Sequence, residues 1–224
     1  MADEEVAPWD DIYRGDAAEF EGPVPWNIGE PQPEIAELIA QGKFRSDVLD
    51  AGCGHAETSL YLAAQGYTVV GLDMSPTAIA AAQKAAQDRG LTGTTFEVAD
   101  ISAFTGFDGR FATIVDSTLF HSLPVDRRRD YLQSVARAAA PGASYYVLVF
   151  AVGAFPEGEG PNAVTEDELR ETVSEFWTVD SIRPAFIHAL QAPPEGSNLQ
   201  IDDAGRTMLP AFLLSAHQAK PVSG

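Results

Sequence analysis

Between about residue 34 and residue 151, the chain alternates short apolar runs with stretches whose apolar residues recur at helical spacing. The apolar runs that we expect to form strands lie at residues 48–49, 67–72, 94–99, 111–115 and 143–151. Such alternation of strands and helices is typical of βαβ units and of a parallel sheet. The pattern therefore predicts a doubly wound α/β domain.

Helices are expected between these runs, and capping residues indicate several of their ends. The expected helical ranges are about 33–41, a stretch through 60–65, then 76–89, 126–139 and 165–176. Ser75-Pro76 suits an N-cap followed by a first helical residue, and Thr165 with Glu168 forms a capping box. Pro141-Gly142 is expected to end the helix before the fifth strand.

The two ends of the chain differ from this central pattern. Two more β-type runs, at about 177–190 and 211–217, flank a segment rich in Pro, Gly and Asp. They predict an antiparallel hairpin that extends the mostly parallel sheet to seven strands. Residues 1–33 instead place Trp9, Tyr13, Phe20 and Trp26 among acids, glycines and prolines. We expect this stretch to form an N-terminal lid segment and residues 34–224 to form a single domain.

Composition narrows the classes of partner. The 224 residues include 33 acidic and 14 basic side chains, for a formal net charge of −19. This excess of negative charge disfavours nucleic acid and anionic membrane surfaces as partners. The single cysteine cannot form an internal disulfide, and no apolar stretch reaches the length of a membrane helix. Because the acidic N-terminus lacks the features of a signal peptide, we expect a soluble, cytoplasmic protein.

Aspartates follow four consecutive predicted strands. They are Asp50, Asp73, Asp100 and Asp116. A solvated surface would not place acids so regularly, and ligands of open α/β sheets bind beyond the carboxyl ends of the strands. The pattern predicts a ligand site at this edge of the sheet.

The loop after the first strand indicates which ligand this is. Gly52 and Gly54 allow a sharp turn and a close approach of the backbone. A dinucleotide fingerprint needs a third glycine where Glu57 stands, and a carboxylate at Asp50 suits a positively charged ligand better than a pyrophosphate. Asp73 can accept hydrogen bonds from both ribose hydroxyls, and Asp100 can accept one from an exocyclic amine such as that of adenine. A cation, a ribose and an adenine together indicate S-adenosylmethionine rather than NAD.

Several motifs resemble those of the class I S-adenosylmethionine-dependent methyltransferases. Residues 48–54 and 69–76 resemble the first two motifs, residues 98–101 the third and residues 111–117 the fourth. The resemblance implies a Rossmann-like fold, and it implies cofactor-binding roles for most of these residues. Gly52 and Gly54 would line the methionyl part, Asp50 would serve its ammonium group, and Asp73 would hold the ribose. Met74, Asp100 and Ile101 would flank the adenine, with Asp116 near the site of transfer; simple core packing is an equal alternative for Met74 and Ile101.

The N-terminal segment resembles one branch of that family. Trp9, Tyr13 and Arg14, followed by residues 25–33, resemble the first segment of thiol, halide and thiopurine methyltransferases. This segment and Phe120-His121 are closer still to mycobacterial enzymes that methylate heterocyclic toxins such as alkylquinolones, which commonly carry Asp where this chain has Asn27. An aromatic lid including Trp26 is expected to cover the cofactor edge and to offer stacking surfaces to a ring. Its alternative is an arm that packs on the domain for stability.

The resemblance implies an in-line methyl transfer in which most of the rate comes from alignment. His121, just after the fourth strand, is the candidate general base, and the alternative is a hydrogen-bonded wall residue. Tyr13 is a weaker candidate for orienting the acceptor. No metal is expected.

The leading hypothesis is a methyltransferase that uses S-adenosylmethionine and acts on an oxygen or nitrogen atom of a small aromatic or heterocyclic substrate. The alternatives are a thiol methyltransferase, a nucleotide-dependent oxidoreductase and a non-catalytic cofactor-binding protein on the same fold. The oligomeric state is left open.

Overall fold

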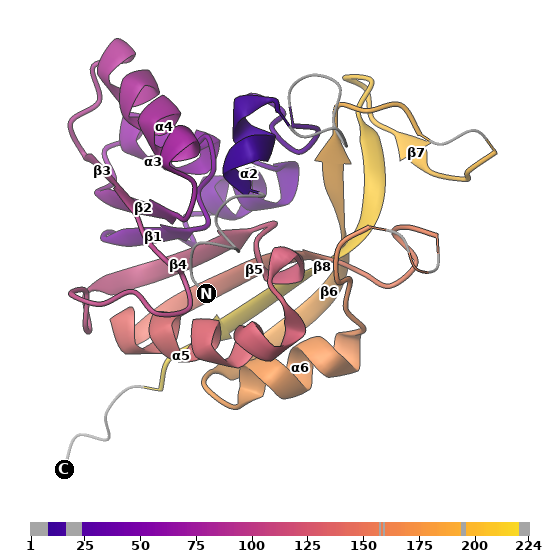
Figure 1. Ribbon diagram of the computed structural model, residues 1–224. Helices are drawn as coiled ribbons and strands as arrows, with labels where there is room; N and C mark the ends of the chain where they lie inside the picture. The colour runs from indigo at the N-terminus through magenta and orange to yellow at the C-terminus, as the bar shows by residue number, and fades with distance from the viewer. Residues whose placement is uncertain (1–8, 17–23, 157, 159, 194–195, 220–224) are drawn as a thin grey trace.

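The computed structural model describes residues 9–16, 24–156, 158, 160–193 and 196–219. Its centre is a twisted sheet with helices on both faces (Figure 1). Neighbouring strands follow the order β3-β2-β1-β4-β5-β8-β6, and the short strand β7 pairs with β8. The strands are β1 (Val48–Ala51), β2 (Val69–Asp73), β3 (Thr94–Val98), β4 (Phe111–Ser117), β5 (Ala139–Phe150), β6 (Thr178–Ala189), β7 (Gln200–Ile201) and β8 (Thr207–His217).

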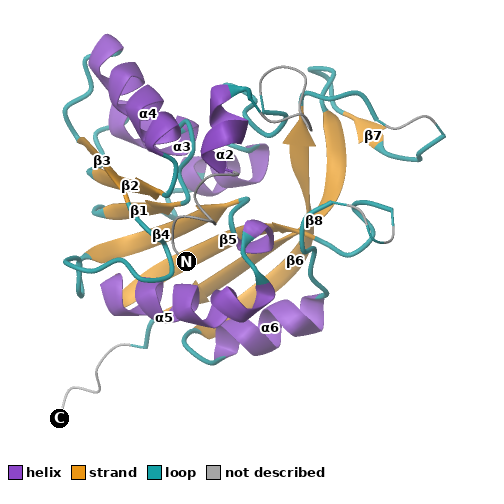
Figure 2. Cartoon of the chain, in the orientation of Figure 1, coloured by secondary structure: helices purple, strands orange, loops and turns teal. Residues whose placement is uncertain are grey.

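The helices divide between the two faces of the sheet (Figure 2). One face is covered by α2 (Pro33–Ala40), α3 (Glu57–Ala64) and α4 (Pro76–Asp88), and the other by α5 (Arg128–Ala138) and α6 (Glu166–Ser174). Because both faces are covered, every residue of β1 and β2 is buried. This is the physical reason that their sequences are apolar runs rather than alternating ones. The predicted mixed α/β fold, with its mostly parallel sheet, is confirmed.

The junction between α5 and β5 corrects one expectation. Pro141-Gly142 lies inside β5, which begins directly after α5, and does not form a loop that ends the helix. The pairing of β4 with β5 shifts register between Phe111 and Thr113, which pair with Ala139 and Ser144. A proline within a strand is tolerated at such an irregularity, because no ladder hydrogen bond is needed there.

The C-terminal hairpin forms as predicted, with the long connection carrying β7. β8 pairs antiparallel with both β5 and β6, so it lies between them. Two short 3-10 turns, η1 (Phe120–Ser122) and η2 (Val125–Arg127), link β4 to α5. Residues 9–14 are helical and precede the domain. Within the described ranges, we find no helix with the length and apolar character needed to cross a membrane.

The register of the parallel strands brings the predicted ligand loops together. Asp50 of β1 pairs with Gly71 of β2 on one side and with Val115 of β4 on the other. Asp73 pairs with Val98, the last residue of β3. The loops that follow these strands therefore open at one edge of the sheet, where the site lies.

Candidate functional site

A cavity of about 900 Å³ lies beyond the carboxyl ends of the parallel strands. It brings together nearly all of the residues that the sequence proposed for the site. These lining residues are Tyr13, Trp26, Asp50, Gly52, Gly54, Asp73, Met74, Asp100, Ile101 and His121. A volume of this size is typical of a small-molecule or cofactor site.

Two buried carboxylates form the acidic end of the cavity. Asp50 is 2% exposed, and its Oδ2 accepts a 2.6 Å hydrogen bond from Ser59. Asp73 accepts hydrogen bonds from the backbone N–H groups of Gly54, at 2.8 Å, and Ser75, at 2.9 Å. Burial raises the pKa of Asp50 to about 6 and also raises the pKa of Asp73. Because burial leaves both carboxylates poorly solvated when they are ionised, a positively charged ligand beside them is favoured.

The glycine loop makes the floor of this end. Gly52 and Gly54 have φ values of +67° and +52°, in the left-handed region that glycine tolerates. A Cβ at Gly52 would lie 2.7 Å from a methyl carbon of Leu119, and one at Gly54 would lie 2.5 Å from the hydroxyl oxygen of Tyr13. Both the backbone conformation and the close contacts therefore require glycine at these two positions.

Asp100 lines the cavity but is already bound to neighbouring side chains. Its Oδ1 accepts hydrogen bonds from the Ser102 N–H and hydroxyl, and its Oδ2 accepts one from Arg127 at 3.0 Å. Arg127 also lines the cavity and was not among the predicted residues. Nothing in the local sequence pairs Arg127 with Asp100, because the two meet only when the loop after β3 packs against η2.

The structure places Asp116 away from the cavity, which corrects its predicted cofactor-binding role. Its side chain is fully buried, and its carboxylate accepts hydrogen bonds from the N–H groups of Leu119 and Phe120 and from the Tyr131 hydroxyl. The hydroxyl of Tyr145 donates in turn to that of Tyr131, at 3.1 Å. Burial raises the pKa of Asp116 to about 7. Asp116 therefore holds the turn that carries His121, and acts on the site only through that turn.

His121 lines the cavity with its ring held from one side. The side chain is 3% exposed, and Nδ1 accepts a hydrogen bond from the backbone N–H of Phe150 at 3.1 Å. Burial, together with the positive charge of Arg128, lowers the pKa of His121 to about 3. Because Nδ1 is occupied, this geometry conflicts with the general-base role predicted for His121.

The N-terminal segment covers the acidic end. Tyr13 packs edge-on against His55 with ring centroids 5.0 Å apart, and Asn27 Nδ2 lies 3.0 Å from His55 Nδ1. Burial and the nearby Asp73 raise the pKa of Tyr13, so its phenol stays protonated. Asp10 ties this segment to α4, since its carboxylate accepts hydrogen bonds from the Ser75 hydroxyl and the Thr77 N–H. Asp10 was not among the predicted residues, because it lies far along the chain from the helix terminus that it caps.

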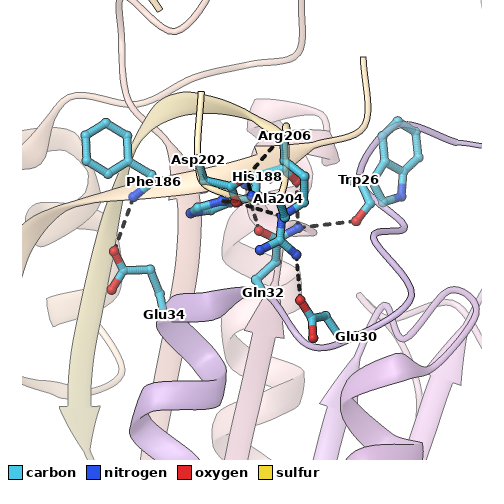
Figure 3. Close-up of polar contacts among 9 residues, drawn as sticks. All are labelled: Trp26, Glu30, Gln32, Glu34, Phe186, His188, Asp202, Ala204 and Arg206. Atoms are coloured by element: carbon cyan, nitrogen blue, oxygen red, sulfur yellow. Dashed lines mark hydrogen bonds and ion pairs between the residues drawn. The ribbon is translucent and has the colours of Figure 1, made fainter. Parts of the chain in front are cut away.

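A polar network fastens the segment before α2 to the C-terminal hairpin (Figure 3). Gln32 is 4% exposed; its amide donates to the backbone oxygens of Trp26 and His188, and its Oε1 accepts from the His188 N–H at 2.8 Å. The His188 ring and Arg206 both contact Asp202, and Arg206 also pairs with Glu30. Trp26, Glu30 and Gln32 all line the cavity, so this network builds one of its walls.

The opposite end of the cavity is apolar and aromatic. Its walls come from the end of β5, from the segment after β5 and from the hairpin strands, and the residues concerned are Phe150, Phe155, Ile187, Ala189 and Leu209. Phe155 packs edge-on against Phe150, and the Phe150 ring lies 4.3 Å from that of His121. Sequence patterns could not identify these residues as a group, because they come from three strands and one connecting segment that are distant in the sequence.

Comparisons with known proteins agree with this arrangement. A family model described as a methyltransferase domain matches residues 48–142. A 2-heptyl-1-hydroxyquinolin-4(1H)-one methyltransferase of Mycobacteroides abscessus is 62% identical over 179 residues, which cover 79% of each chain. This similarity extends well beyond the matched domain.

Solved structures give the same picture. A structure from work on the conversion of a disulfide bond into a thioacetal group during echinomycin biosynthesis superimposes with a TM-score of 0.83 and 34% identity, over 97% of this chain and 94% of that one. A 1,6-didemethyltoxoflavin-N1-methyltransferase of Burkholderia thailandensis shares the fold, with a TM-score of 0.60 and 22% identity over 84% and 77% of the two chains. The similarity to the first structure therefore spans nearly the whole molecule.

Proposed function

Because this chain belongs to the S-adenosylmethionine-dependent methyltransferases, we propose that it moves a methyl group to an oxygen or nitrogen atom of a small aromatic heterocycle. The observation that carries the proposal is the continuity of one cavity from buried acids to an apolar, aromatic wall. The acidic end suits the charged cofactor and the aromatic end suits a flat acceptor. The quinolone named for the 62% identical relative is a molecule of this class.

The residues of the acidic end fit the cofactor, which supplies an electrophilic methyl group when bound. Asp50 and Asp73 offer two desolvated carboxylates, which suit an ammonium group and a pair of ribose hydroxyls. Gly52 and Gly54 line the cavity without a side chain, so their backbone can approach the ligand closely. Met74, Asp100 and Ile101 also line the cavity, and the role proposed for them is to flank the adenine.

The remaining walls are proposed to position the acceptor. Trp26 packs edge-on against Trp9, with ring centroids 6.3 Å apart, and presents an aromatic surface to the cavity. Tyr13, still protonated, can donate a hydrogen bond that orients a ligand. Holding the acceptor in line with the methyl group, in a site that excludes water, accounts for most of the expected acceleration.

Calorimetry and mass spectrometry test the two halves of the proposal. The protein should bind S-adenosylhomocysteine saturably, and Asp73→Asn should weaken that binding by about 1.5–3 kcal/mol, as expected for hydrogen bonds to a charged group. Asp203→Asn, at an exposed position on the hairpin connection, is the matched control. With S-adenosylmethionine, 2-heptyl-1-hydroxyquinolin-4(1H)-one should gain the mass of one methyl group. Methylation of thiols but of no heterocycle would refute the proposed acceptor class, and absence of cofactor binding would refute the whole proposal.

A further inference from the structure

The ring of His121 lines the cavity and is fixed against Phe150 of its aromatic wall. Its Nδ1 accepts the Phe150 N–H at 3.1 Å, and its face lies against the Phe150 ring at 4.3 Å. The backbone oxygen of His121 accepts a hydrogen bond from Asn162 N–H at 3.0 Å, so η1 is also held against the segment after β5. The ring therefore keeps one orientation relative to the cavity.

This orientation determines which nitrogen carries the proton. A neutral imidazole has one N–H and one acceptor nitrogen. Since Nδ1 accepts the backbone N–H, the proton of the neutral ring lies on Nε2. A ring nitrogen that already bears its proton cannot take another from a substrate unless the ring becomes charged.

The surroundings of His121 oppose a charged ring. Burial lowers the pKa of His121 to about 3, and Arg128 of α5 adds to this effect. Arg128 is itself buried; it pairs with Glu168 of α6 at 2.9 Å and lies 4.9 Å above the Phe120 ring. Glu168 is 41% exposed, so water screens its charge more than that of Arg128. Asp116, on β4, is already committed to Tyr131 and to the turn.

Three carboxylates that line the cavity are proposed to serve the cofactor. Asp50 accepts a hydrogen bond from Ser59, Asp73 from Gly54 and Ser75, and Asp100 from Ser102 and Arg127. Burial raises the pKa of Cys53, so its thiol stays protonated.

The remaining titratable side chains of the described cavity are no better placed to remove a proton. Burial raises the pKa of Tyr13, which keeps it a donor, and His55 Nδ1 is engaged by Asn27. Glu30 is paired with Arg206 at 2.6 Å and Glu57 with Arg89 at 3.3 Å. Apart from the carboxylates proposed to bind the cofactor, the described residues of the cavity therefore offer no free base for the acceptor.

Building on the proposed function, we propose that His121 donates its Nε2–H to the oxygen of an acceptor that has already lost its proton to solvent, so that this protein methylates acidic hydroxyl groups such as N-hydroxyls. In this step, a lone pair of the acceptor oxygen forms the new bond to the methyl carbon. The carbon–sulfur bond breaks and its electron pair stays on sulfur, so no proton moves within the protein. A fixed donor holds the oxyanion in place. The buried positive charge of Arg128, which acts on the His121 ring, also favours a negative acceptor in a chain whose net charge is −19.

The pH dependence of kcat/KM distinguishes this role from that of a general base. Two acceptors are compared at saturating S-adenosylmethionine: 2-heptyl-1-hydroxyquinolin-4(1H)-one and a ring-fluorinated derivative whose hydroxyl is more acidic. We expect kcat/KM to rise with pH and to level off at the pKa of each free acceptor, so the break should move with the acceptor. A break that stays at the same pH for both acceptors would identify an ionising group of the protein and overturn the inference.

Two substitutions test the donor itself. His121→Asn keeps an oxygen that can accept the Phe150 N–H but removes the donor at the position of Nε2, and it should lower kcat/KM by about 10- to 100-fold. In the His121→Asn variant, kcat/KM should still level off at the pKa of the acceptor, and the affinity for S-adenosylhomocysteine should not change. His121→Gln, whose amide can reach the position of Nε2, should recover part of the loss. His217→Asn, at a half-exposed histidine of β8, is the matched control.

A direct measurement completes the experiment. The absorbance of the quinolone bound beside S-adenosylhomocysteine should be that of its ionised form at a pH below the pKa of the free compound, because the donor stabilises the anion. A bound neutral form, or unchanged turnover in a correctly folded His121→Asn variant, would overturn the inference. If neither acceptor gained a methyl group while S-adenosylhomocysteine still bound, the proposed acceptor class would be wrong, and this inference would be wrong with it. If both acceptors gained a methyl group but kcat/KM levelled off at the same pH for both, only this inference would be overturned.

Discussion

Replacing Asp116 by Asn should make the protein progressively more stable relative to wild type as the pH rises from about 4 to about 7. The carboxyl is fully buried, and burial raises its pKa to about 7. An Asp in the unfolded chain ionises near 3.9. Between these two values the unfolded state releases a proton that the folded state retains, so rising pH favours unfolding of the wild type. At about 1.4 kcal/mol per pKa unit, the full effect is about 4 kcal/mol.

Asparagine can replace the carboxylate with little loss of hydrogen bonding. Its oxygen can still accept the N–H groups of Leu119 and Phe120, and its amide can donate to the Tyr131 oxygen. The Tyr131 hydroxyl would then donate to Tyr145, which reverses the direction of the bond that now joins them. The amide pays no cost of ionisation, so its contribution does not depend on pH.

Urea unfolding followed by circular dichroism at pH 5, 6, 7 and 8 measures this difference. The free energy of unfolding of Asp116→Asn, minus that of wild type, should grow with pH and level off above about pH 7. Asp203→Asn, on the exposed hairpin connection, should show no such trend. A difference that is constant over this range, or that shrinks as the pH rises, would refute the assignment of a raised pKa to Asp116.

Three further predictions follow from the site. Asp50 has a pKa of about 6 when no ligand is bound, so the affinity of the protein for S-adenosylhomocysteine should fall by up to about tenfold per pH unit below pH 6. Calorimetry measures this affinity, and a value that is constant from pH 7 to pH 5 would argue against a role of Asp50 in binding the ammonium group. Asn27→Asp should raise the pKa of His55, which burial now lowers, because the new carboxylate stabilises a charged imidazole. NMR titration of the ring protons measures the change, and an unaltered pKa would exclude direct contact between residue 27 and the His55 ring. Gln32→Leu leaves buried backbone groups of residue 188 without partners, so it should lower the free energy of unfolding by about 2–4 kcal/mol and raise KM for the acceptor. The exposed control Gln41→Leu should do neither, and denaturation and initial-rate kinetics measure both effects.

Much of the architecture could be predicted because it depends on short-range sequence patterns, such as apolar runs and capping residues. A strand that is covered on both faces must be apolar throughout, so runs such as 69–72 identify buried strands without knowledge of their neighbours. Ser75 caps α4 by a hydrogen bond within its own turn, as its sequence indicates. Pro141-Gly142 was misread because the irregular pairing that accommodates it depends on β4, about 30 residues earlier.

The residues of the candidate site also differ in whether local sequence patterns could predict their position. That Asp50, Asp73 and the loop glycines line the cavity could be predicted, because the carboxyl end of each parallel strand must open at one edge of the sheet. Asp116 obeyed the same rule, yet its side chain points to Tyr131 and Tyr145, whose positions depend on α5 and β5. Gln32 and its partner His188 are 156 residues apart, so no local signal could join them.

The amino-acid sequence by itself thus determined the order of the elements, the edge of the sheet at which the cavity lies, and the carboxylates and glycines that line it. These features depend on periodicity and on strand direction, which neighbouring residues encode. Only the tertiary structure decided how the site residues are charged and which proton each one holds. His121 became a candidate donor, and not a base, because the N–H of Phe150 from another strand occupies its Nδ1 and because burial removes the water that would stabilise a charged ring. Desolvation and partners distant in the sequence set protonation, and both exist only once the chain has folded.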